Sequence, residues 1–296
     1  MGAVRVLLLM AVGVVAVSMS GPLMAAMVVP PLAISFWRNG FATVGLAPVA
    51  LTRRRDEVIE LRGRPVLLVG GAGLALAVHF GTWVTALTLT SVASATALVC
   101  LQIAWVAAWQ LVRGERYGVG VVAGLVLAFC GVLVVSGVDL TVSTRSLVGD
   151  LLALVGGAAG ATYTVIGSRA RQALTTTTYT FLVYGTCAAA LLVASVVGGQ
   201  PLGGYPLRQW GLLVLVTLTS QLLGHSVFNH LLATTSPMLV SLALLLEVPG
   251  ASLLAAAFLG QVPPAGALVG LAMVLAGMAL VVVNDRTRTV RPQPPD

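Results

Sequence analysis

Hydrophobic residues along the chain fall into ten long runs, which are separated by short breaks containing prolines, glycines or charged residues. A helix that crosses a bilayer needs about 20 predominantly apolar residues. The runs have about this length, so the pattern predicts an all-α integral membrane protein with ten transmembrane helices. The expected spans are 4–21, 32–51, 65–88, 91–112, 118–138, 149–168, 178–198, 209–233, 236–259 and 264–283.

The composition agrees with this pattern and excludes an ordinary soluble fold. Hydrophobic residues make up 58% of the chain and charged residues 8%, against about 45–50% and about 25% in soluble domains. The chain has no lysine, which excludes a Walker phosphate loop and a pyridoxal Schiff base. The three cysteines have no CxxC spacing, and the three histidines and Glu247 are spread over spans at different depths. No metal and no other cofactor is therefore expected.

The arginines are divided unevenly between the predicted loops. If the N-terminus is cytoplasmic, thirteen of the sixteen lie in inner segments and two, Arg145 and Arg208, lie outside, while Arg38 lies within the second run. Arginine-rich short loops stay on the cytoplasmic side. We therefore expect a multi-pass protein of the cell membrane (inner or plasma membrane) with both termini cytoplasmic. Arginines scattered over separate loops give no reason to expect a nucleic-acid partner.

The sequence also repeats itself at one spacing. Ser91 and Ser236 are 145 positions apart, and so are Gln102 and Glu247. Four glycine pairs follow at a spacing of 146, where composition predicts about 0.2 pairs by chance. These pairs are Gly114 and Gly260, Gly120 and Gly266, Gly124 and Gly270, and Gly131 and Gly277.

The repeat divides the chain into two five-helix units, 1–140 and 146–284, followed by a tail at 285–296 that we expect to be disordered and cytoplasmic. Five is an odd number, so the second unit must enter the membrane in the opposite orientation to the first. Such inverted repeats are the architecture of many secondary transporters. The first run could instead be a cleaved signal peptide, but the repeat requires it as the partner of the sixth.

Two segments carry a resemblance to a known family. TLTSVASATALVCLQIAWVAAWQLVRGER at 88–116 and GHSVFNHLLATTSPMLVSLALLLEVPGASLLAAAFLGQ at 224–261 resemble the two copies of the EamA-type module of the drug/metabolite transporter superfamily. The stretch 20–51 is similar to that family's first two helices. The resemblance implies a ten-helix inverted-repeat carrier of small metabolites, often moved outward. It also implies a central cavity lined by the third, fourth, eighth and ninth helices.

The resemblance places the family's polar position of the fourth helix on Gln102 and its acidic position of the ninth helix on Glu247. Three features depart from the family pattern. Ile103 stands where a proline often follows, Pro249 comes one residue late, and Gly260-Gln261 replaces a frequent Gly-Glu. Because cavity lining decides specificity, these departures leave the substrate class open.

Glu247 is the costliest residue in the runs, because an ionised carboxylate at a helix centre costs about 2.5–3.5 kcal/mol on insertion scales. It is either a protonatable or substrate-contacting group in a wet cavity, or a neutral acid bonded between helices. Gln102, at the same depth as Glu247 in the other unit, either contacts the substrate or forms hydrogen bonds between helices. Arg38 is an anion anchor, a snorkelling side chain, or a structural group that pairs with Glu247 or caps carbonyls near Pro30-Pro31.

Two further pairs of side chains share a helix face because they are four residues apart. His225 and Asn229 on the eighth span are expected to line a cavity, with contact to partner helices as the alternative. His79 and Trp83 on the third span pack between helices or contact substrate. The candidate substrate-binding residues are Arg38, His79, Trp83, Gln102, His225, Asn229 and Glu247.

The chain has neither a His-Glu-x-x-His nor a Gly-x-Ser-x-Gly motif, so an enzyme is not expected. The expected function is a secondary transporter, more specifically an exporter, of small metabolites, amino acids or drug-like solutes by alternating access. Its partners are then a small-molecule solute and the lipid bilayer, with protons as a candidate coupling ion. The alternative is a membrane assembly protein without transport, which would not need midplane polar residues at repeat-related positions.

Overall fold

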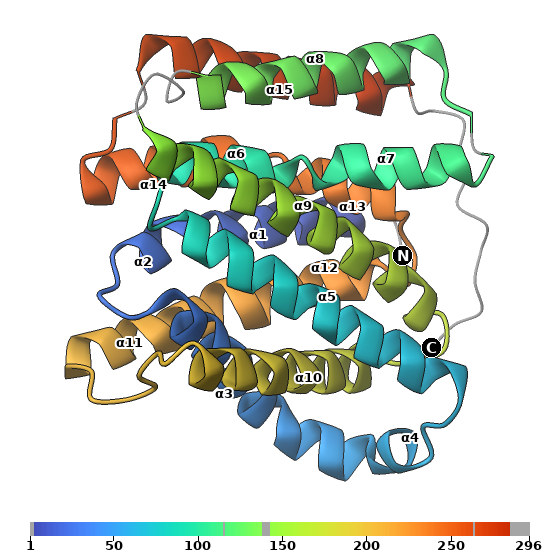
Figure 1. The fold of residues 1–296 in the computed structure, drawn as a ribbon. Helices are drawn as coiled ribbons and strands as arrows, with labels where there is room; N and C mark the ends of the chain where they lie inside the picture. The colour runs from blue at the N-terminus through green and yellow to red at the C-terminus, as the bar shows by residue number, and fades with distance from the viewer. Residues whose placement is uncertain (1–2, 115, 138–142, 263, 285–296) are drawn as a thin grey trace.

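The structure, a computed structural model, describes residues 3–114, 116–137, 143–262 and 264–284. Within these ranges the regular structure is entirely helical (Figure 1). This is what an apolar chain in lipid requires, because a helix satisfies its backbone hydrogen bonds within the segment. The expected tail at 285–296 lies outside the described residues.

Helices cover each of the ten apolar runs. Those before residue 140 are α1 (Ala3–Ser18), α2 (Ser20–Ala25), α3 (Pro31–Arg53), α4 (Arg55–Ile59), α5 (Arg64–Ala86), α6 (Val92–Cys100), α7 (Gln102–Val112) and α8 (Val119–Gly137). Those after it are α9 (Thr144–Ala170), α10 (Thr176–Val197), α11 (Leu207–Val216), the π-helix η1 (Thr217–His225), α12 (Ser226–Leu231), α13 (Pro237–Leu244), α14 (Glu247–Leu259) and α15 (Ala265–Asn284).

Seven helical segments of the described chain are long and apolar enough to cross a membrane. They are 4–25, 64–86, 92–112, 144–170, 176–197, 207–231 and 237–259. The segments 119–134 and 265–281 are apolar but shorter. α3 is not among the segments that are both long and apolar enough. α3 carries Arg38 and Asn39 in its interior, and such polar side chains lower the hydropathy of a span.

Ser91 and Ser236, two of the residues that reveal the repeat, both begin helices. The Ser91 hydroxyl accepts a hydrogen bond from the Ser94 amide at 3.1 Å and caps α6. The Ser236 hydroxyl accepts one from the Leu239 amide at 3.2 Å and caps α13. Each serine thus satisfies one of the amides that a helix start leaves free, which explains why both units keep this residue.

The fourth and ninth apolar runs are each broken in the middle. Leu101 separates α6 from α7, and Leu245 and Leu246 separate α13 from α14. The turns are tightened by bonds over three residues, from the Leu101 amide to the Leu98 carbonyl and from the Leu245 amide to the Leu242 carbonyl. The second half of each broken helix begins with a polar residue, Gln102 in α7 and Glu247 in α14.

α8 and α15 contact each other through repeat-related glycines. A Cβ atom added at Gly124 would lie 2.6 Å from the Gly277 carbonyl oxygen, and one at Gly131 would lie 2.6 Å from the Gly270 oxygen. Since the contact position moves backward along α15 as it moves forward along α8, the helices are antiparallel. Gly124 pairs with the repeat mate of Gly131, and Gly131 pairs with the mate of Gly124. This reciprocity is the mark of a two-fold relation.

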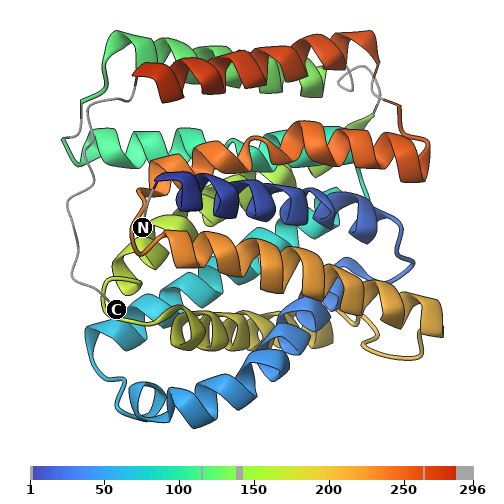
Figure 2. The same ribbon diagram turned by 180° about the vertical axis from the view of Figure 1, so that it is seen from behind.

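Figures 1 and 2 show how the helices are layered. The α8–α15 pair lies on one outer side of the bundle, and α3 and α10 lie on the opposite side. The broken helices α6–α7 and α13–α14 lie next to the α8–α15 pair, with α1, α5, α9 and the α11–η1–α12 segment between them and the α3–α10 pair. The end of the bundle that holds α4 also holds the start of α1 and the end of α15.

Candidate functional site

A buried cavity lies in the middle layers of the bundle, beside the breaks in both broken helices. Its volume is about 30 Å³, which is room for a few water molecules. The lining comes from both sequence units: His79, Trp83, Val99, Cys100, Gln102, Gly160, Tyr163, Thr164, His225, Phe228, Asn229, Leu232, Val240, Leu244 and Glu247.

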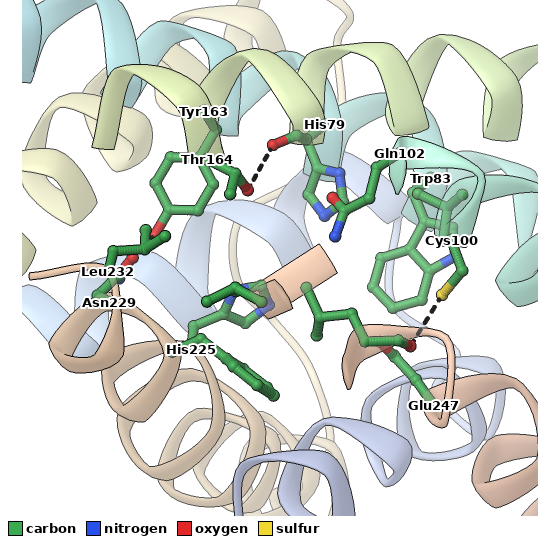
Figure 3. A pocket seen from close by; sticks show the side chains of 15 residues that line it. His79, Trp83, Cys100, Gln102, Tyr163, Thr164, His225, Asn229, Leu232 and Glu247 are labelled. Atoms are coloured by element: carbon green, nitrogen blue, oxygen red, sulfur yellow. Dashed lines mark hydrogen bonds between the residues drawn. The ribbon is translucent and has the colours of Figure 1, made fainter. Parts of the chain in front are cut away.

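Six of the seven residues expected to bind substrate line this cavity, and Arg38 does not. Figure 3 shows His79 and Gln102 approaching the space from one side, and His225 and Glu247 from the other. These four residues come from α5, α7, η1 and α14, which belong to the third, fourth, eighth and ninth predicted spans.

His79 and His225 face one another with their ring centroids 6.4 Å apart. One histidine comes from each sequence unit, and they are 146 positions apart, one more than the spacing of 145 that joins Gln102 to Glu247. The Nδ1 atom of His79 lies 2.9 Å from the Gly156 carbonyl oxygen. Because a carbonyl can only accept a hydrogen bond, Nδ1 carries the proton, and in the neutral ring Nε2 is left as an acceptor. The ring of His225 packs against Phe80 at 5.3 Å.

Close approach of α9 gives the cavity its wall beside Gln102. A Cβ at Gly160 would lie 2.6 Å from the Gln102 side-chain oxygen and 2.9 Å from Nδ1 of His79. A Cβ at Gly157 would lie 2.9 Å from the Val99 carbonyl oxygen. Only glycine leaves room for these two side chains and for the broken turn between α6 and α7.

Gln102 and Glu247 are buried, with exposures of 6% and 7%. Within the described residues, no hydrogen bond or ion pair joins either side chain to the protein. The indole N–H of Trp83 is also without a partner there. Buried polar groups normally have partners, so a group of unsatisfied polar ends around one cavity is the arrangement expected of a binding site.

Asn229 lines the cavity, but its amide is already engaged. The Tyr163 hydroxyl donates to Asn229 Oδ1 at 2.5 Å, and Asn229 Nδ2 donates to the Tyr184 hydroxyl at 3.2 Å. The backbone oxygen of Asn229 accepts a bond from Nε of Arg171 at 3.0 Å. These bonds hold Asn229 in place. Its side chain therefore forms part of the cavity wall, and its amide is already engaged with the two tyrosines.

Arg38 is completely buried, and the snorkelling interpretation is wrong. Its Nε donates to Gln221 Oε1 at 2.9 Å and its Nη1 donates to Ser20 Oγ at 3.1 Å. The guanidinium carbon lies 4.1 Å from the centre of the Phe80 ring, at cation–π distance. Nη2 has no partner among the described residues. Arg38 thus lies behind Phe80, and its hydrogen bonds go to residues other than Glu247.

The π-helix η1 carries both Gln221 and His225. Gln221 accepts from Arg38 and donates through Nε2 to Asn39 Oδ1 at 3.1 Å, so its amide orientation is fixed. π-helical turns are rare and often occur at functional sites. Here the wider turn is the segment that brings Gln221 to Arg38 and His225 to the cavity.

The sequence prediction did not identify Tyr163, Tyr184 or Gln221 as part of the polar network. A signal for Gln221 exists, because it precedes His225 by four residues, as His225 precedes Asn229. The tyrosines give no comparable signal, since a lone tyrosine in an apolar run also occurs as a core residue. Among the described residues, no cluster of three histidine, cysteine or acidic side chains is arranged to hold a metal ion.

Comparison with known proteins gives three findings. The model of the EamA-like transporter family matches this chain twice, over residues 4–137 and 147–283. An uncharacterized transporter of Archaeoglobus fulgidus is 31% identical over 136 residues, which are 45% of this chain and 41% of the relative. The match therefore spans less than half of that relative's length.

The third finding concerns the fold. A solved structure described only as the crystal structure of a protein superposes with a TM-score of 0.75 at 17% identity. The match covers 97% of this chain and 100% of the other. At this level of identity the likeness shows a shared fold and nothing about the solute.

Proposed function

The chain belongs to the EamA-like transporter family, and from this premise we propose that it is a secondary transporter which exports small solutes across the cell membrane by alternating access. Its solute would bind at the cavity between the broken helices. The solute would contact His79, Trp83, Gln102, His225 and Glu247. Asn229 would hold the cavity wall in place through its hydrogen bonds, and Arg38 would supply a positive charge behind the wall.

The proposal includes ten membrane-spanning helices in two inverted units. The antiparallel, reciprocal contact of Gly124 with Gly277 and of Gly131 with Gly270 supports the inversion. α1 begins and α15 ends at the same end of the bundle, as an even number of spans requires (Figure 2). With the arginine distribution, this end is the cytoplasmic one.

The observation that carries the proposal is the pairing of polar groups across the cavity. His79 of one unit lies opposite His225 of the other, and the repeat-related Gln102 and Glu247 begin the second halves of two broken helices beside the same space. Broken helices around a central site at the repeat interface are typical of secondary transporters. A protein that served only for assembly would gain nothing from unsatisfied polar groups at this place.

The small cavity volume fits one state of the transport cycle. A cavity of about 30 Å³ is smaller than the roughly 300–1,000 Å³ of a typical ligand site. A solute would therefore enter only after helices move apart on one side. In this proposal the structure would correspond to a state between the two open ones.

The test is a solute screen with the purified full chain. Proteoliposomes are loaded with a defined mixture of amino acids, nucleosides, sugars, organic acids and amines, and the loss of each compound is followed by mass spectrometry against protein-free liposomes. The proposal predicts selective loss of one chemical class. Retention of every compound, with and without a proton gradient, would contradict it.

A further inference from the structure

The outer helices α3 and α10 hold each other at both ends through hydrogen bonds that cross between the two sequence units. At one end, Glu57 of α4 meets the start of α10. At the other end, Gln200, just after α10, meets the start of α3. Figure 1 shows α4 at one end of the bundle, with α11 and the α2–α3 connection at the other.

The Glu57 clasp consists of three short hydrogen bonds. Glu57 Oε1 accepts from the Thr175 backbone amide, and Oε2 accepts from the hydroxyls of Thr175 and Thr178, each at 2.7 Å. The carboxylate thus sits at the N-terminus of the 22-residue helix α10, where the helix dipole also favours negative charge. Charge-assisted bonds of this kind are among the stronger ones in proteins.

The Gln200 clasp is the reciprocal contact. Gln200 Oε1 accepts from the Leu32 amide at the start of α3 at 3.0 Å. Close by, Gln209 Oε1 accepts from the Val28 amide at 3.1 Å. In each unit, therefore, the connection that follows the second span caps the second span of the other unit. The acceptor is a charged carboxylate at one end and neutral amides at the other.

Both clasps connect to elements that lead into the cavity walls. α4 is the helix before α5, which carries His79, and Thr175 lies in the short connection after α9, which carries Tyr163. At the same end, Arg171 ties the end of α9 to Asn229 of α12. At the opposite end, α11, which carries Gln209, continues into η1 and His225. At each end, therefore, hydrogen bonds between the two units join the elements that lead into the cavity walls.

We propose that the Glu57–Thr175–Thr178 contact and the Gln200–Leu32 contact are the two releasable clasps of the transport cycle, each of which must open for the cavity to open at its own end. The clasp with the carboxylate is the tighter one. It keeps the Glu57 end closed for more of the time than the Gln200 end. This inference rests on the proposed alternating-access function.

Cys100 is a native reporter, because it lines the cavity and is buried. The experiment measures its modification in the full chain by a membrane-impermeant methanethiosulfonate reagent, added to one face of oriented vesicles at a time and read by peptide mass spectrometry. A Glu60→Cys reporter identifies the Glu57 face. No transported solute is required, so failure of the clasps and failure of the transport proposal remain distinguishable.

Glu57→Gln and Thr178→Val are each expected to raise Cys100 modification from the Glu57 face by about tenfold, the scale of one lost charge-assisted hydrogen bond. Gln200→Ala is expected to raise it from the opposite face only. Glu60→Gln, an exposed neighbour on the same connection, is the matched control and leaves the rates unchanged. Rates for Glu57→Gln equal to those of the control, or a rise from both faces together, would overturn the proposal.

Discussion

His79 and His225, one from each sequence unit, lie edge to face across the cavity with their ring centroids 6.4 Å apart. Gln102 and Glu247, which are related by the repeat, line the same cavity, so both units contribute equivalent positions to it. A solute at this point would meet a histidine from each unit, with Gln102 from one unit and the corresponding Glu247 from the other. This difference puts a carboxyl group on one side of the site.

The position of both histidines on one cavity leads to a first prediction. His79→Phe and His225→Phe should each raise the KM for the exported solute by about tenfold, because each removes a polar atom from the same cavity while keeping a ring. His230, which contacts Thr176 and does not line the cavity, provides the control His230→Phe with an unchanged KM. A change confined to one of the two cavity histidines would argue against the shared site.

The glycines of α8 and α15 give a prediction about stability. Gly124→Ala should lower the thermal unfolding midpoint in detergent, because its Cβ would lie 2.6 Å from the Gly277 oxygen and force the helices apart. Gly70 of α5 has nothing within 4 Å of an added Cβ. Gly70→Ala is the matched control and should be neutral or stabilising by up to about 1 kcal/mol. Equal midpoints for both variants would refute the close glycine contact.

Gln221 accepts a hydrogen bond from the buried guanidinium of Arg38, so replacing Gln221 should lower the stability of the fold. Gln221→Leu leaves Nε of Arg38 without its acceptor and should lower the free energy of unfolding by about 1–3 kcal/mol. Gln221→Glu keeps an acceptor for Arg38 but loses the donor to Asn39, so it should cost less. Thermal unfolding of both variants in the same detergent checks the order, and the reverse order would contradict this role.

The hydrogen bonds of Glu57 should make the stability of the fold depend on pH. Desolvation by burial acts to raise the pKa of Glu57, but the hydrogen bonds from Thr178 and Thr175, together with the charge of Arg54, outweigh it and lower the pKa below its ordinary value of 4.5. A lowered pKa stabilises the folded state above pH 4.5, and this contribution is lost as the pH falls through the lowered value. The midpoint difference between the wild type and Glu57→Gln should therefore be largest near neutral pH and shrink below pH 4.5. A difference that grows on acidification would show that the sign is wrong.

Much of the fold follows from the hydrophobic pattern, because each apolar run must form a helix to satisfy its backbone in lipid. The serine caps at Ser91 and Ser236 and the glycine pairs were visible as repeats before their contacts were known. The breaks at Leu101 and at Leu245 were not predicted. Pro249 has no amide to bond to the Leu245 carbonyl four residues earlier, so it is a local signal for the second break. No proline stands at this distance after Leu101, where tertiary packing decides.

The free-energy cost of burying a polar side chain in the membrane was an effective guide to the residues of the site. It pointed to Gln102 and Glu247, which line one cavity in the structure. It did not distinguish a side chain that faces the cavity from one bonded behind it, as the position of Arg38 shows. That distinction depends on partners such as Gln221 from a distant span, which the sequence does not bring together.

The most direct test of the account is the export rate of the solute found by the screen, measured in proteoliposomes for the wild type, Glu247→Gln and the exposed control Glu60→Gln. We predict that Glu247→Gln lowers the rate at least about tenfold, because it removes the ionisable group from the cavity, while Glu60→Gln exports like the wild type. Wild-type export by Glu247→Gln would contradict a central site at the junction of the two units.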